Sequence, residues 1–200
     1  FYLGMEHQSA IAYGNKFMQG YLGHYPGNMD FDFIVIHESG HEYWGNSVSM
    51  NDIADMWIHE SFCTYTEALY VEKIYGYEKM LEYLVYQRDF IDGGSPILGH
   101  RDVNKEGNSV DMYYKGSWML HSIRNTIVND SLWFSILKDL AQKFEKSNCN
   151  GNDVINYICN QSKKDLRPIF DQYLSYSDLP VLKYRFKKEK GVMYFYYKWD

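Results

Sequence analysis

At 200 residues, the chain is long enough to form one domain, or slightly more, around a hydrophobic core. Hydrophobic residues make up 46% of it and charged residues 23%, which is typical of a folded globular protein. The formal net charge of −6 argues against a nucleic-acid partner, because binding one would need a basic surface. No apolar run approaches the roughly 20 residues that cross a bilayer, so we expect no membrane segment.

The N-terminal part is predicted to lead into a helix. Residues 1–25 are rich in Gly and Tyr, and we interpret them as the edge of a sheet with loops. Pro26-Gly27-Asn28 is typical of a turn. A helix is then predicted from Asp30, whose side chain can cap the free backbone amides of the first turn, to about Gly45.

The rest of the chain is predicted to be helical up to about residue 179. Helices are expected over 55–75, 77–91, 110–128, 131–147, 153–162 and 166–176, with Gly76 ending the first of them. After Pro180, two β-branched and aromatic runs flank Glu189-Lys190-Gly191, which predicts a hairpin. We therefore expect a sheet edge over 1–25, a helical domain over 26–179 and the truncated start of a β domain over 180–200.

The cysteines and the first residue carry little information about function. Cys63, Cys149 and Cys159 are odd in number and lack a CxxC spacing, which argues against a disulfide framework but leaves one bridge between Cys149 and Cys159 open. The chain begins at Phe1, without Met and without a signal-peptide pattern. We therefore expect a piece of a longer protein, separated from its flanking domains.

The chemistry is concentrated in the His-Glu-x-x-His segment that begins at His37. Residues four apart on a helix differ by about 40° in direction, so His37 and His41 face the same way and can both bind one tetrahedral zinc ion. Glu38 points to the adjoining side, where it can reach a metal-bound water as a general base. From the motif alone, a helix that carries two histidines and binds no metal is as good an interpretation as a zinc site.

A third ligand is needed for a catalytic zinc, which keeps its fourth position free. Glu60 follows His41 with 18 residues between them, on the second predicted helix. Glu67, two turns further along, faces the same way and can accept the second N–H of a ligand histidine. The alternative is that both glutamates belong to a solvated helix face, and we interpret His59 as an ordinary polar residue.

This spacing, with Glu60 inside Trp57-Ile58-His59-Glu60-Ser61-Phe62, resembles the gluzincin aminopeptidases, the family of alanyl (membrane) aminopeptidases and leukotriene A hydrolase. The continuation His41-Glu42-Tyr43-Trp44-Gly45-Asn46 is also similar to that family. The resemblance covers residues 1 to about 180, with four motifs in the family's order. It implies a mainly α, thermolysin-like catalytic domain, with a short β segment before it and the start of a β-sandwich after it. It also implies one Zn²⁺ per chain, bound by His37, His41 and Glu60.

Two further motifs extend the resemblance. Gly4-Met5-Glu6-His7 resembles the family's G-x-M-E-N exopeptidase motif, in which the glutamate binds the free α-amino group of the substrate, although His7 replaces Asn. A carboxylate in that place favours a peptide with a free N-terminus. The segment from Asp111 to Gly116 resembles the family's Y-x-K-G motif. It implies that Tyr113, rather than Tyr114, stabilises the oxyanion, and Lys115 is expected to tie a helix to its surroundings.

The function predicted is hydrolysis of the N-terminal residue of peptides by a zinc-activated water, with Glu38 as general base. A zinc endopeptidase would share the zinc ligands but would not need Glu6. An epoxide hydrolase would use the same zinc, and nothing in the sequence singles it out. A non-catalytic, zinc-stabilised binding module is the alternative from another class, against which Glu38 and Tyr113 argue.

Overall fold

The computed structural model describes residues 3–18, 28–103 and 109–200. The helices are α1 (Phe33–Gly40), α2 (Trp57–Tyr75), α3 (Tyr77–Arg88), α4 (Tyr114–Ile127), α5 (Asp130–Lys143), α6 (Gly151–Ser162) and α7 (Arg167–Ser175), with short 3-10 helices η2 (Ile53–Asp55) and η3 (Val110–Met112). The strands are β1 (Gly4–His7), β2 (Ala10–Tyr13), β3 (Val48–Met50), β4 (Ser147–Cys149), β5 (Leu182–Glu189) and β6 (Val192–Trp199). The expected mainly α class is confirmed.

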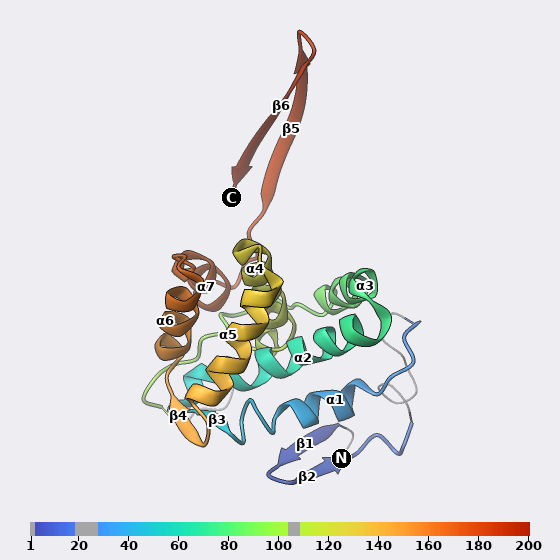
Figure 1. Ribbon diagram of the computed structural model, residues 1–200, viewed down its shortest axis with the longest axis vertical. Helices are drawn as coiled ribbons and strands as arrows, with labels where there is room; N and C mark the ends of the chain where they lie inside the picture. Colours follow the sequence, from blue (N-terminus) through green and yellow to red (C-terminus); the bar gives the residue numbers. More distant parts are fainter. Residues whose placement is uncertain (1–2, 19–27, 104–108) are drawn as a thin grey trace.

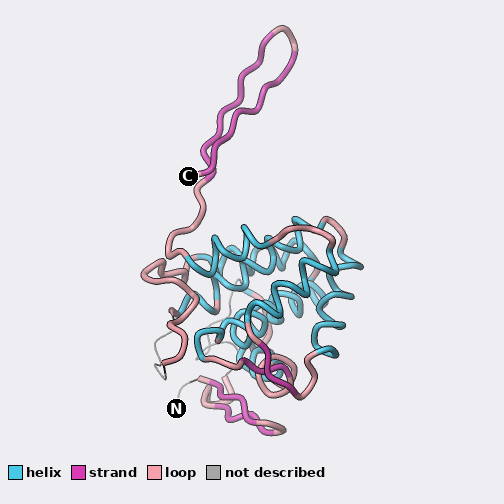
Figure 2. Tube along the Cα trace, turned by 90° about the vertical axis from the view of Figure 1, so that its left-hand side faces the viewer, coloured by secondary structure: helices cyan, strands magenta, loops and turns pink. Residues whose placement is uncertain are grey.

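The helices form one body with a β-hairpin at each end of the chain (Figure 1). The antiparallel pair β1–β2 lies along α1, and the antiparallel pair β5–β6 projects away from the helices in both views (Figures 1 and 2). Among the described residues, no helix combines the length and the apolar composition that crossing a membrane requires.

Helix α2 runs through the centre of the core. Its side chains are buried on several faces, with Trp57, Phe62 and Tyr65 among the largest that solvent does not reach. Helix α4 approaches α2 closely at Gly116, where an added Cβ would overlap the side chain of Ser61. Because α2 packs against α1 and α4, it holds the residues of both in fixed positions.

Helix α1 is shorter at both ends than the helix predicted from Asp30 to about Gly45. The N-cap of α1 is Asp32 rather than Asp30, because the Asp32 carboxylate accepts the backbone N–H of Ile34 at 3.1 Å. The helix ends at Gly40, and the chain then turns through Gly45, whose φ of +138° breaks the helical path. Of the expected turn at 26–28, Pro26 and Gly27 lie outside the described residues.

Other boundaries also shift. The helix expected over 110–128 is divided, because η3 ends at Met112 and α4 begins only at Tyr114. The helix expected over 131–147 ends at Lys143, and β4 then pairs in parallel with β3, a pairing that was not predicted. The hairpin of β5 and β6 is confirmed. The division of the chain into domains at residues 25 and 179 stays a prediction.

The three cysteines are free and buried, so no bridge joins Cys149 to Cys159. Lys115 is fully buried, and its ammonium donates to the carbonyl oxygens of Tyr176 and Ser177 at 2.5 and 2.8 Å. It therefore ties α4 to the segment that follows α7.

Candidate metal centre

Helices α1 and α2 bring three potential ligands to one point. Nε2 of His37 lies 3.2 Å, and Nε2 of His41 3.6 Å, from the same oxygen, Oε2 of Glu60. Tetrahedral zinc with bonds of about 2.0–2.1 Å holds its ligand atoms about 3.3 Å apart. The spacing of the three ligand atoms therefore suits a single zinc ion.

The other nitrogen of each histidine already has an acceptor. Nδ1 of His37 lies 2.7 Å from Oε1 of Glu67, and Nδ1 of His41 lies 2.9 Å from the carbonyl oxygen of Trp44. A proton on each Nδ1 satisfies these acceptors and leaves the Nε2 lone pairs directed at the Glu60 carboxylate. Lone pairs that face a carboxylate at this distance repel it unless a proton or a metal cation lies between them, so the donor set fits zinc.

The charges of the cluster also favour a cation. Burial by itself opposes ionisation of Glu60, but hydrogen bonds with His37 and His41 lower its pKa to about 2. Burial likewise opposes the charged form of His37, yet hydrogen bonds with Glu60 and Glu67 raise its pKa to about 10. In the metal-free cluster, protons on imidazole supply the positive charge that a metal would supply instead.

Glu38 lies beside this cluster with part of its hydrogen-bonding capacity unused. The residue is buried, and its Oε2 has no hydrogen-bond partner among the described residues. Burial raises the pKa of Glu38 above its ordinary value. Its side chain rests on β1 at Gly4, where an added Cβ would overlap the carboxylate. A buried, unpaired carboxylate oxygen is suited to accept a proton from a small molecule in the site.

Strand β1 places only some of the predicted substrate-binding residues at the cluster. Because side chains alternate along a strand, Gly4 and Glu6 face α1, whereas Met5 stands on the opposite face and is exposed. Oε1 of Glu6 lies 3.9 Å from Nδ1 of His41. Ligand atoms of Glu6, Glu38 and His41 all lie within 4.8 Å of one another.

The two neighbouring tyrosines have different surroundings. The Tyr113 ring lies 5.9 Å from that of His37, whereas the Tyr114 ring lies 5.3 Å from that of Phe90. Tyr113 stands at the junction between η3 and α4 rather than inside a helix, so the expected 100° helical separation does not apply. Burial raises the pKa of Tyr113 well above its ordinary value, which keeps its phenol protonated as a donor.

Two residues near the site were not assigned a structural role from the sequence. Asp111 is fully buried and accepts the backbone N–H groups of Asp92 and Gly93 at 2.7 and 2.9 Å, which holds the segment before Tyr113. His59 is buried, and its Nε2 accepts from the Met50 amide at 3.2 Å. Burial lowers the pKa of His59 to about 4. Nothing local in the sequence indicates either contact, since Asp111 accepts from residues 18 and 19 positions earlier and His59 from a residue nine positions earlier.

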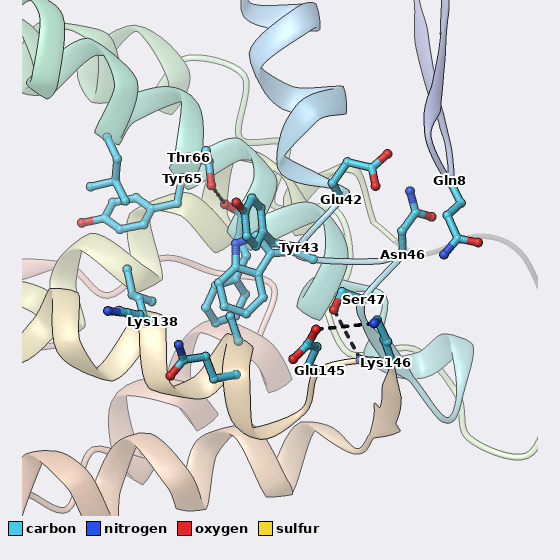
Figure 3. A pocket seen from close by; sticks show the side chains of 16 residues that line it. Gln8, Glu42, Tyr43, Asn46, Ser47, Tyr65, Thr66, Lys138, Glu145 and Lys146 are labelled. Atoms are coloured by element: carbon cyan, nitrogen blue, oxygen red, sulfur yellow. Dashed lines mark hydrogen bonds and ion pairs between the residues drawn. The ribbon is translucent and has the colours of Figure 1, made fainter.

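A large groove is separate from the predicted zinc ligands. A groove of about 750 Å³ lies between α2, α5 and the turns that follow α1 (Figure 3). Trp44, Phe62 and Leu137 contribute to its apolar lining, and Glu42 and Lys146 to its charged groups. The described residues that line it include none of the predicted site residues. The groove is therefore a different surface from the metal centre.

Comparison with known proteins places the chain in a family. Residues 2–173 match the Peptidase family M1 domain. Aminopeptidase N of Lactococcus lactis subsp. lactis is 29% identical over an alignment of 161 positions that covers 74% of this chain and 19% of that protein. Leucyl aminopeptidase of Saccharolobus solfataricus is 26% identical over an alignment of 160 positions that covers 75% of this chain and 20% of that protein. The chain thus spans about a fifth of the length of these relatives.

Solved structures share the fold. A mutant M1 zinc metallopeptidase from Deinococcus radiodurans, bound to a Tyr-Ser-Ala substrate, matches with a TM-score of 0.70 at 17% identity, over 90% of this chain and 38% of that one. Legionella pneumophila aminopeptidase A, in complex with aspartic acid, matches with a TM-score of 0.64 at 16% identity, over 84% of this chain and 19% of that one. The fold agrees with the sequence match, and the chain belongs to peptidase family M1.

Proposed function

We propose that this chain carries the active site of a zinc-dependent aminopeptidase, which hydrolyses the N-terminal residue from peptides. The observation that carries the proposal is the position of Glu6, whose carboxylate lies 3.9 Å from His41 at the edge of the ligand cluster. A carboxylate so near a peptidase metal recognises a substrate ammonium group and limits the site to one residue before the scissile bond. The names of the M1 relatives support the same activity.

In this proposal His37, His41 and Glu60 hold one zinc ion. A bound zinc ion supplies a water of lowered pKa and polarises the scissile carbonyl group. Glu67 and the Trp44 carbonyl fix both imidazole rings through their Nδ1 atoms, so the rings need no reorientation when the metal enters.

Three further residues have proposed roles in the reaction. Glu38 accepts a proton on its unpaired Oε2 and returns it to the leaving amine. The Tyr113 phenol, held protonated by burial, donates a hydrogen bond to the carbonyl oxygen as negative charge develops there. Glu6 holds the substrate ammonium group and so sets which peptide bond meets Glu38. Gly4 admits Glu38 to its position, whereas Met5 faces away from the cluster.

The test compares matched substrates on the zinc-loaded full-length protein. Metal analysis should give one zinc ion per chain, and aminoacyl fluorogenic substrates with a free amine should be cleaved far faster than their N-acetylated counterparts. An endopeptidase would cleave blocked peptides well, and a zinc-stabilised binding module would cleave neither. Either outcome would overturn the proposal.

A further inference from the structure

We propose that Glu42 and Tyr13 are positioning residues for the substrate amine, because they fix the β1–β2 hairpin, which carries Glu6, to the zinc-binding helix α1. The inference rests on the proposed aminopeptidase function and extends it to two residues that are not among the predicted metal-binding or substrate-binding residues. Each attaches the hairpin to α1 at a different end of that helix.

The first attachment is at the turn of the hairpin. The backbone N–H of Ser9 donates to Oε1 of Glu42 at 2.9 Å. Ser9 has a φ of +66° and lies in the turn between β1 and β2, outside the ladder of either strand. Figure 3 shows Glu42 after α1 with its carboxylate on the side of the hairpin that carries Gln8. Glu42 directly follows His41, so the contact begins one residue from a predicted zinc ligand.

The second attachment is at the open end of the hairpin. The Tyr13 hydroxyl donates to the carboxylate of Asp32, the N-cap of α1. Tyr13 pairs with Gly4 across the hairpin, so this contact lies beside the point where Gly4 meets Glu38. The hairpin is thus attached before the first turn of α1 and just after its last.

Little apolar burial supports the hairpin between these two attachments. Within the described residues β1 and β2 pair only with each other, and none of their eight residues is fully buried. Two-stranded hairpins are marginally stable on their own in water. The polar contacts at both ends, together with the contact of Gly4 with Glu38, therefore help to set the distance between Glu6 and the predicted metal ligands, and with it the register of the substrate amine.

Two single variants remove one attachment each. Glu42→Leu removes the acceptor for Ser9. Tyr13→Phe removes the donor to Asp32, together with the contacts of the hydroxyl with the Met18 carbonyl oxygen and the Asn15 amide, and leaves the N-cap of α1 intact. Glu42→Gln keeps an acceptor oxygen at the same chain length and should restore the wild-type behaviour. Glu145→Leu is the matched control. Glu145 is an exposed glutamate that lines the same groove as Glu42, and within the described residues its ion pair is with Lys146 rather than with the hairpin.

We expect each attachment variant to raise KM for free-amine substrates about three- to tenfold, the fold-change that corresponds to losing one ordinary hydrogen bond near solvent, with kcat within about twofold of wild type. Cleavage of N-acetylated substrates and zinc content should not change. Hydrogen exchange in the peptide that spans residues 3–14 should accelerate in both variants, and not in Glu42→Gln or Glu145→Leu.

Two results would overturn the inference. Attachment variants that match Glu145→Leu in KM and in hydrogen exchange would show that the contacts do not hold the hairpin. Equal losses on free-amine and acetylated substrates, with loss of zinc, would assign Glu42 and Tyr13 to the stability of α1 instead. Absence of turnover in the wild-type protein would refute the proposed function, whereas the exchange measurement would still decide whether these residues hold the hairpin.

Discussion

Gly4 of β1 lies directly against the Glu38 carboxylate. Only glycine fits at position 4, because the Cβ of any other residue would overlap the Glu38 side chain. The proposed general base therefore depends on a glycine 34 residues earlier in the chain. Strand β1 contributes to the site both through Glu6 and through the absence of a side chain at Gly4.

Gly4→Ala should displace either Glu38 or the strand. We expect kcat/KM to fall about tenfold or more, the cost of forcing a methyl group into a packed site, with zinc content unchanged. Gly94→Ala is the control, because its new methyl group would meet only the exposed carboxylate of Asp92, which can rotate away. Wild-type turnover in Gly4→Ala would show that Glu38 can act from another position.

Glu38→Gln should retain zinc and lose nearly all turnover. The amide has the same shape but cannot accept a proton, so general-base catalysis, which contributes roughly 10²–10⁴-fold, is removed. Substrate affinity, measured by binding of an uncleaved free-amine peptide, should stay close to that of wild type. Near-normal activity in this variant would exclude Glu38 as the base.

Glu67→Ala should weaken zinc binding, although Glu67 is not one of the predicted zinc ligands. The variant removes the acceptor that lies 2.7 Å from His37 Nδ1 and fixes that ring. Losing such a partner costs about 10–100-fold in metal affinity, which competition with a chelator measures. Tyr83→Phe is the control, since it removes another contact of Glu67 and leaves the carboxylate in place. Equal affinities in Glu67→Ala and wild type would contradict the assignment.

Tyr113→Phe and Tyr114→Phe separate the two neighbouring tyrosines. Loss of one oxyanion donor lowers kcat by roughly 10²–10³, with little change in KM, and we expect this for Tyr113→Phe. Tyr114 packs on Phe90, so its variant should be much milder. Steady-state kinetics of the two variants decide the matter, and a larger effect at position 114 would move the proposed role to that residue.

The convergence of His37 and His41 could be predicted because it depends only on the period of one helix. The contact of Glu67 with His37 joins two helices, and it follows from the same period only once Glu60 is placed beside the histidines, since Glu67 lies seven residues after Glu60, about two turns along the same helix. These predictions use local geometry, which the sequence pattern expresses directly.

Contacts between distant segments could not be predicted in the same way. The bond from Ser9 to Glu42 joins residues 33 apart, and no pattern in either segment indicates its partner. Strands β3 and β4 are three residues each and pair across about 100 positions, too short to show an alternating pattern. Tyr113 was assigned to a helix because the break between η3 and α4 has no glycine or proline to mark it.

Glu6→Ala is the variant that separates an aminopeptidase from an endopeptidase. If Glu6 holds the substrate ammonium group, its loss should cost about 2–5 kcal/mol in kcat/KM for free-amine substrates, the range for removing one partner of a desolvated charge pair. N-acetylated substrates carry no such charge, so their slow cleavage should change little. The measurement is kcat/KM for each matched pair of substrates on wild type and Glu6→Ala. Parallel losses would assign Glu6 to the fold of β1, and no loss would mean that another carboxylate binds the amine.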